Sequence, residues 1–246
     1  MKRRRYRLFN RVIVAVVGSS NSGKTTAIEA IIKGLTKKGY TVASAKRIPE
    51  QDFTIDKKGK DTYKHAQAGS STVLSVAPNE LAVITKVDTK KYTLEQLIAQ
   101  IPEETDVIII EGFKSLVGHD MTIPKIVATT SDNEIVQALE RYKNILAFIG
   151  HIPDQKIETE IPFIDTLHEP EKLVEIVNKK VAVLVERKRE REKRITIYVD
   201  EQILPLGDFV QDIIRNSVLA MIASLKGAKI KGEEKVSIAI KRLTKG

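Results

Sequence analysis

Cysteine is absent from the sequence, which excludes disulfides, thiolate metal sites and cysteine nucleophiles. Any chemistry must therefore use oxygen and nitrogen groups. The four histidines do not show metal-ligand spacing, and we assign no catalytic role to them: His65, His119, His151 and His168.

Long hydrophobic runs are also missing. No apolar stretch reaches the roughly eighteen residues that a membrane helix needs. The basic start, MKRRRYRLFN, is not followed by the apolar segment of a signal peptide. With 42% hydrophobic and 30% charged residues, the composition is typical of a globular protein. We expect a cytoplasmic protein with no membrane partner.

The net charge of +9 is concentrated in KRRRYR at the start and in ERKREREKR at 186–194. Both runs are interpreted as a solvated tail or linker rather than as a nucleic-acid site. Neither is accompanied by a helix-turn-helix pattern, an aromatic RNA-binding pair or a zinc knuckle.

Apolar runs and helical periods alternate through the first three quarters of the chain. Strands are predicted at 12–17, 41–45, 72–76, 81–85, 107–110, 126–129 and 145–149, and helices at 24–38, 61–68, 93–101, 133–142 and 171–189. This alternation predicts an α/β fold with a mostly parallel sheet and helices on both faces. Ligands of such sheets bind at the carboxyl ends of the strands.

The charge run at 186–194 is either the exposed end of the last helix or a linker, and it separates a domain at 1–190 from a small module at 195–246. A hairpin turning at Asp200 to Gln202, a helix capped by Asp208 and ended by Gly227, and the strand KVSIAIKRL predict a ββαβ arrangement. No role is indicated for this module beyond a protein contact or dimerisation.

The segment from Gly18 to Thr25 matches G-x-x-x-x-G-K-[ST] and lies between a buried strand and a helix. Its backbone amides and the helix N-terminus are suited to nucleotide phosphates. Lys24 would reach the β- and γ-phosphates, and the Thr25 hydroxyl would bind Mg²⁺. The other predicted contacts of this P-loop NTPase-like site are Ser19, Asn21, Ser22 and Gly23.

A carboxylate follows the aliphatic strand DVIIIEGFK. Glu111 comes directly after four aliphatic residues, so it would emerge beside the phosphate loop as a metal ligand. The other interpretation is an ordinary carboxylate at a strand end.

The polar segment KRIPEQDFTIDKKGKD, which follows the second strand, is too long for a simple connection. Asp56 and Asp61 would contact the metal or orient a water, and Lys46, Arg47 and Lys60 would hold anionic groups. Each residue alone is equally well explained as a solvated charge.

Two stretches resemble the N-K-x-D guanine motif: TKVD at 85–88 and TTSD at 129–132. Only the second follows the Glu111 strand, as the order in guanine-binding proteins requires. Asp132 would then accept hydrogen bonds from guanine N1 and N2. The N-cap of the following helix is an equally good role for it.

Three stretches, GSSNSGKTT, DFTIDKKGKDTYKHAQAG and IIIEGFK, together resemble the molybdopterin-guanine dinucleotide biosynthesis protein B (MobB) family over about residues 11–180. The resemblance implies a GTP-binding homodimer with slow GTPase activity that assists the guanylyltransferase MobA in joining GMP to molybdopterin. It also implies roles for Gly23, Lys24, Thr25 and Thr26 on phosphates and Mg²⁺, and for Asp56, Gly59, Lys60, Asp61, Glu111, Gly112 and Lys114. Many members carry Lys-His where this chain has Lys46-Arg47.

We therefore expect a GTP-binding accessory protein of molybdenum cofactor biosynthesis. Hydrolysis should be slow because no arginine finger or dedicated base is evident near the γ-phosphate. One alternative is a small-molecule kinase in which Asp56 or Asp61 activates the acceptor. The other is a nucleic-acid-binding ATPase that uses the basic N-terminus.

Overall fold

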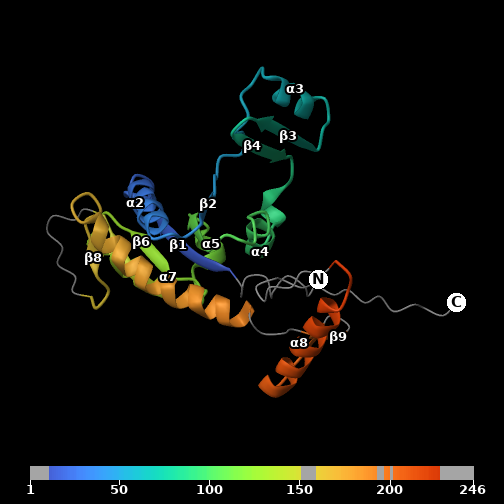
Figure 1. The fold of residues 1–246 in the computed structure, drawn as a ribbon. Coiled ribbons are helices and arrows are strands. Elements are labelled where there is room, and N and C mark those ends of the chain that lie inside the picture. Colours follow the sequence, from blue (N-terminus) through green and yellow to red (C-terminus); the bar gives the residue numbers. More distant parts are fainter. Residues whose placement is uncertain (1–10, 151–158, 193–196, 200–201, 228–246) are drawn as a thin grey trace. The chain divides into compact units, whose positions relative to one another are not determined.

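The structure is a computed structural model that describes residues 11–150, 159–192, 197–199 and 202–227 (Figure 1). The chain divides into two compact units, Met1–Arg189 and Glu190–Gly246. None of the helices within the described ranges is long and apolar enough to cross a membrane.

The first unit is built on a six-stranded sheet with the order β2-β5-β1-β6-β7-β8. All of its pairings are parallel, which confirms the predicted α/β fold. The strands are β1 (Val12–Gly18), β2 (Val42–Lys46), β5 (Val107–Glu111), β6 (Lys125–Ala128), β7 (Ile145–Ile149) and β8 (Phe163–Ile164).

Helices cover both faces of this sheet, as predicted (Figure 1). One hydrophobic core joins the sheet to α2 (Lys24–Lys37) and α7 (Pro170–Glu192), and the other joins it to α4 (Leu94–Ile98), α5 (Lys114–Val117) and α6 (Asp132–Arg141). Successive residues of a strand point to opposite faces, so β1 supplies both cores. Its members are Val12, Val14 and Val16 in the first core and Ile13, Ala15 and Val17 in the second.

Two of the predicted strands form a separate sheet. β3 (Thr72–Ala77) and β4 (Glu80–Thr85) pair antiparallel with each other and with no strand of the main sheet. Only Pro78 and Asn79 join them, and a connection this short permits a hairpin but not a parallel crossover. The hairpin lies beside α3 (Asp61–Gln67) and is followed by a 3-10 turn, η2 (Thr89–Lys91) (Figure 1).

The boundaries of α7 and α6 decide two alternatives left open by the sequence: whether the charge run at 186–194 is a linker, and whether Asp132 caps a helix. The charge run after position 186 continues α7 to Glu192, so this part is the end of a helix rather than a linker. Ser131 is the N-cap of α6, and its hydroxyl accepts a hydrogen bond from the Glu134 amide at 3.4 Å. The alternative that Asp132 is the N-cap is therefore wrong, since Asp132 is the first helical residue.

The second unit contains the strands β9 (Ile197–Val199) and β10 (Gln202–Leu204), paired antiparallel, and the helix α8 (Asp208–Ala223). The predicted cap is wrong, because Gly207 occupies the N-cap position and Asp208 begins the helix. The helix ends at Ala223 with Ser224 as its C-cap, so Gly227 does not end it. The turn residues 200 and 201, the predicted strand KVSIAIKRL and the basic start lie outside the described residues.

A lysine is buried at the start of β6. Lys125 has no exposed surface, and its ammonium donates hydrogen bonds to the carbonyl oxygens of Asp120 (2.7 Å) and Ile123 (2.8 Å). Burial lowers the pKa of Lys125 from 10.5 to about 8, although the Asp120 carboxylate acts in the opposite direction.

This burial predicts stability that rises with alkaline pH. Between pH 8 and 10 the unfolded chain keeps a proton at Lys125 that the folded chain loses, so the free energy of unfolding should increase by about 1–2 kcal/mol from this residue. Urea unfolding at both pH values should show the increment in the wild type and a smaller one in Lys125→Met. The exposed Lys172→Met variant controls for loss of a positive charge. An unchanged increment in Lys125→Met would show that this lysine is not responsible.

Candidate nucleotide site

The phosphate loop joins the central strand β1 to α2. Gly18 has φ +146°, and a Cβ at this position would lie 2.2 Å from the carbonyl oxygen of Ala128 on the neighbouring strand β6. Gly23, the N-cap of α2, has φ +84°, in the left-handed region that favours glycine. The backbone of the loop therefore requires both glycines of the motif.

Two side chains of the phosphate loop donate hydrogen bonds to the same backbone carbonyl oxygen, that of Ser19. The Ser22 hydroxyl donates a hydrogen bond to the Ser19 carbonyl oxygen at 2.8 Å, and the Lys24 ammonium donates to the same oxygen. α2 has no side-chain cap and no acidic residue in its first turn. Its first amides, which have no partner within the helix, are therefore suited to an anion.

Glu111 stands at the carboxyl end of β5, beside the loop. In the sheet register it lies between Val16 of β1 and Lys46 of β2. Its carboxylate forms an ion pair with the Lys46 ammonium at 3.2 Å, with side chains 15% and 57% exposed respectively. Arg47, which follows Lys46 in the chain, donates a hydrogen bond from its guanidinium to the Ser115 hydroxyl at 3.0 Å.

Lys24 of the phosphate loop is within electrostatic reach of several charged side chains. Burial lowers the pKa of Lys24, and Lys114 and Lys46 lower it further, while Glu111 and Glu134 act in the opposite direction. The structure therefore brings Lys24, Glu111 and Lys114, the last two from the strand-end motif EGFK, into one electrostatic cluster.

Glu134 is a member of this cluster that the sequence interpretation missed. Its carboxylate accepts hydrogen bonds from the Thr130 amide (2.7 Å) and hydroxyl (3.1 Å). Burial acts to raise the pKa of Glu134, but the hydrogen bonds from Thr130, the nearby Ser19 side chain and the charge of Lys114 outweigh it, so the pKa is lowered. The signal was present, because Ser131 and Glu134 have the S-x-x-E spacing of a capping box.

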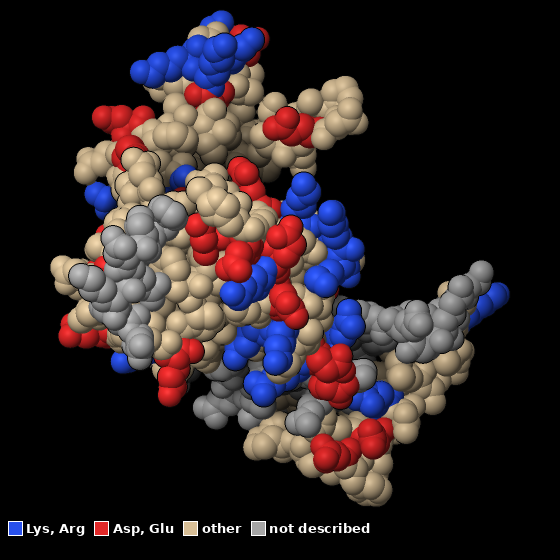
Figure 2. All heavy atoms as spheres, turned by 90° about the vertical axis from the view of Figure 1, so that its left-hand side faces the viewer, with Lys and Arg blue, Asp and Glu red and all other residues tan. Residues whose placement is uncertain are grey.

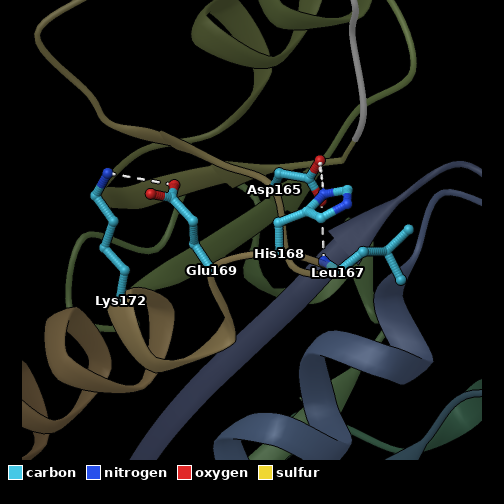
Figure 3. Close-up of polar contacts among 5 residues, drawn as sticks. All are labelled: Asp165, Leu167, His168, Glu169 and Lys172. Carbon is cyan, nitrogen blue, oxygen red and sulfur yellow. Dashed lines mark hydrogen bonds and ion pairs between the residues drawn. The ribbon is translucent and has the colours of Figure 1, made fainter.

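The loop after β8 also borders the site. A Cβ at Gly23 would lie 3.8 Å from the hydroxyl oxygen of the buried Thr166, so this loop passes beside the P-loop. Figure 3 shows how it is held: the Asp165 carboxylate accepts a hydrogen bond from the Leu167 amide and contacts His168 Nδ1, both at 2.9 Å. A second pair, Glu169 and Lys172 at 3.4 Å, follows at the start of α7.

Of the residues predicted in the long polar segment after β2, Lys46 and Arg47 contact Glu111 and Ser115, whereas Asp56 and Asp61 make contacts within the segment itself. Asp56 accepts a hydrogen bond from the Thr62 hydroxyl at 2.9 Å, and the 85% exposed Asp61 side chain pairs with Lys64 at 3.2 Å. Lys60 is the exposed N-cap of α3. These contacts of Asp56 and Asp61 stay within the segment and do not extend to Lys24 or Glu111.

The groups near the loop suit Mg²⁺. Thr25 offers an exposed hydroxyl and Glu111 a carboxylate, and hard oxygen donors of this kind are the ligands that Mg²⁺ prefers. No cluster of three or more acidic, histidine or cysteine ligands occurs among the described residues. Mg²⁺ does not need one, because it usually takes one or two protein ligands together with phosphates and water.

These features define a P-loop NTPase-like α/β protein. The family model for molybdopterin guanine dinucleotide synthesis protein B (MobB) matches residues 13–151, and the chain belongs to this family.

Several known proteins are similar to the chain. A putative molybdopterin-guanine dinucleotide biosynthesis adapter protein of Methanocaldococcus jannaschii is 29% identical over 94% of this chain and 99% of that protein, so the similarity extends into the second unit. A probable adapter protein of the same name from Bacillus subtilis is 34% identical over 56% of this chain and 75% of its own.

Solved structures support the fold. A crystal structure of molybdopterin-guanine biosynthesis protein B has a TM-score of 0.55 and 25% identity, covering 70% of this chain and 99% of that one. A MobB homolog from Bacillus stearothermophilus has a TM-score of 0.52 and 20% identity, covering 70% and 98%.

Proposed function

We propose that the protein is a GTP-binding adapter in the synthesis of molybdopterin guanine dinucleotide. The observation that carries this proposal is a phosphate loop, with Lys24 beside Glu111, in a chain of the MobB family. The adapter role is the one that the names of its relatives give.

In this proposal the loop amides and the first turn of α2 hold the phosphates. Lys24 leaves the Ser19 carbonyl oxygen for the β- and γ-phosphates, and Thr25 and Glu111 hold Mg²⁺, which neutralises phosphate charge when bound. The further contacts come from Gly18, Ser19, Asn21, Ser22, Gly23 and Thr26.

Slow hydrolysis is part of the proposal. Asp56 and Asp61 are already engaged by Thr62 and Lys64 of their own segment, and these contacts compete with a role in orienting an attacking water, while Lys60 is exposed. The partners in this function would be molybdopterin and the guanylyltransferase MobA.

Asp132 is our candidate for guanine recognition. It follows β6, next to the strand that carries the loop, and is the first residue of α6. Its carboxylate would accept hydrogen bonds from guanine N1 and N2, which adenine does not offer. A site that hydrogen-bonds these two donors should reject adenine strongly.

The test is equilibrium binding of GTP and ATP, each with Mg²⁺, to the wild type and Asp132→Ala. GTP should bind at least about tenfold more tightly to the wild type, and Asp132→Ala should lose the preference. Asp208→Ala is a matched control because Asp208 is also the first residue of a helix, α8. ATP binding as tight as GTP binding would reject the role of Asp132 in guanine recognition and favour the alternative function of a small-molecule kinase.

We also propose that the β3–β4 hairpin carries the homodimer contact. Its exposed apolar face consists of two cross-strand pairs, Leu74 with Val83 and Val76 with Leu81, whose side chains are 58–73% exposed. Contiguous exposed apolar side chains of this kind are typical of protein contact surfaces, and this supports a contact with a second copy of the chain.

A double variant, Leu74→Glu with Val83→Glu, should therefore be monomeric where the wild type is dimeric, because each charge would be buried in the contact. Sedimentation velocity at micromolar concentrations measures the difference. Val183→Glu, at an exposed apolar position of α7, is the control. A wild type that sediments as a monomer, or a double variant that stays dimeric, would rule out this contact.

A further inference from the structure

The ion pair between Lys46 and Glu111 joins two neighbouring strands at the phosphate end of the sheet. Their Cα atoms are direct partners in the β2–β5 register, and Glu111 is also the partner of Val16, close before Gly18. The carboxylate is mostly shielded and the lysine is more than half exposed. The backbone of both residues is held by the sheet, and the exposed Lys46 side chain has more room than Glu111 to adopt another rotamer.

The charged groups around Lys24 have a net positive charge. The groups that act on Lys24 are the ammonium groups of Lys46 and Lys114 and the carboxylates of Glu111 and Glu134. With Lys24 itself, three ammonium groups face two carboxylates. Glu134 is already hydrogen-bonded to Thr130, so its acceptor capacity is partly used.

The same carboxylate oxygen atoms are the proposed Mg²⁺ ligands. A divalent cation and an ammonium group at 3.2 Å from one carboxylate would repel each other, and the divalent ion has the stronger attraction. The lysine would therefore be displaced. A displaced Lys46 has a flexible four-carbon chain and would lie at the end of the sheet where phosphates bind.

We propose that Lys46 is a phosphate-binding residue that exchanges partners: it holds Glu111 in the nucleotide-free protein and contacts the terminal phosphate of a bound nucleoside triphosphate once Mg²⁺ is at Glu111. The proposal rests on the proposed nucleotide site. Lys46 would thereby make the protein bind nucleoside triphosphates in preference to diphosphates. With a diphosphate, the displaced ammonium has no γ-phosphate to contact and competes with Mg²⁺ for Glu111.

The experiment measures equilibrium binding of GDP and of a non-hydrolysable GTP analogue, both with Mg²⁺, to the wild type, Lys46→Met and Lys46→Arg. Methionine keeps much of the side-chain volume without the charge, and arginine keeps the charge. Lys172→Met is the matched control, because Lys172 is similarly exposed (53%) and also pairs with a glutamate. Circular dichroism confirms that each variant is folded.

Lys46→Met should weaken binding of the analogue about tenfold, the loss typical of one charge-assisted hydrogen bond. Its affinity for GDP should change less than about twofold, and the Mg²⁺ concentration that half-saturates the GDP complex should fall. Lys46→Arg should keep most of the affinity for the analogue.

Equal losses for the two nucleotides, or a loss no larger than that of Lys172→Met, would overturn the role of Lys46 while leaving the nucleotide site intact. A wild type that binds neither nucleotide would instead reject the proposed function, and this inference with it.

Discussion

Gly18→Ala is expected to lower the free energy of unfolding by about 3 kcal/mol or more. The added methyl carbon would lie 2.2 Å from the Ala128 carbonyl oxygen and 2.9 Å from the Ala128 Cβ, and the backbone has φ +146°. Both residues belong to paired strands at the centre of the sheet, so neither can move away without breaking the β1–β6 ladder. Urea unfolding of the wild type and the variant measures the loss.

Gly39→Ala separates backbone strain from the clash. Gly39 has φ +87°, but nothing lies within 4 Å of a Cβ there. Its loss should be about 1 kcal/mol, the strain of a left-handed residue alone. Equal losses in the two variants would show that the contact with Ala128 is not the cause of the effect at Gly18.

Lys24→Ala is expected to reduce GTP affinity about 100-fold or more, with little change in folding stability. The variant removes an ammonium that would contact two phosphates, and contacts of this strength are worth about 1.5–3 kcal/mol each. Stability should hold because the partner of Lys24 is a carbonyl oxygen of the loop, which Ser22 also contacts. Binding of a fluorescent GTP analogue with Mg²⁺, together with thermal unfolding, measures both quantities.

Lys172→Ala is the control for this variant as well, because it removes an exposed ammonium from an ion pair outside the loop. A Lys24→Ala protein that binds GTP within about threefold of the wild type would contradict the phosphate role. A variant that is unfolded would contradict the expected stability.

The centre of the main sheet was predictable because β1, β5 and β6 are buried on both faces and read as continuous aliphatic runs. The partner of a strand is not encoded in its own pattern. β3 and β4 have the same apolar character as the others, and only the two-residue connection at Pro78 and Asn79 indicates a hairpin. The short elements α5 and β8 fall below the length at which a periodicity can be recognised.

The candidate site was predictable where it lies directly at a strand end. Glu111 ends β5 and Lys24 follows β1 after the phosphate loop, and the two strands are neighbours in the sheet. Lys24 and Glu111 interact for that reason. Asp56 and Asp61 lie in a long connection whose direction no periodicity defines. Thr166 was missed because a two-residue strand brings it beside Gly23.

The acidic and basic side chains are intermixed on the face of the molecule shown in Figure 2, where red and blue lie side by side over its middle. On this face, such mixing does not form the continuous basic surface that a nucleic-acid-binding ATPase would use. The basic start of the chain, on which that alternative rests, lies outside the described residues.

The position of β1 in the sheet has a consequence for folding. β1 is the first of the described strands, yet its partners β5 and β6 begin only at residue 107 and residue 125. Pairings between such distant segments are slow to form, and they leave the apolar β1 exposed until its partners emerge from the ribosome. We expect the phosphate loop to become structured late, and the nascent chain to depend on chaperones over that interval.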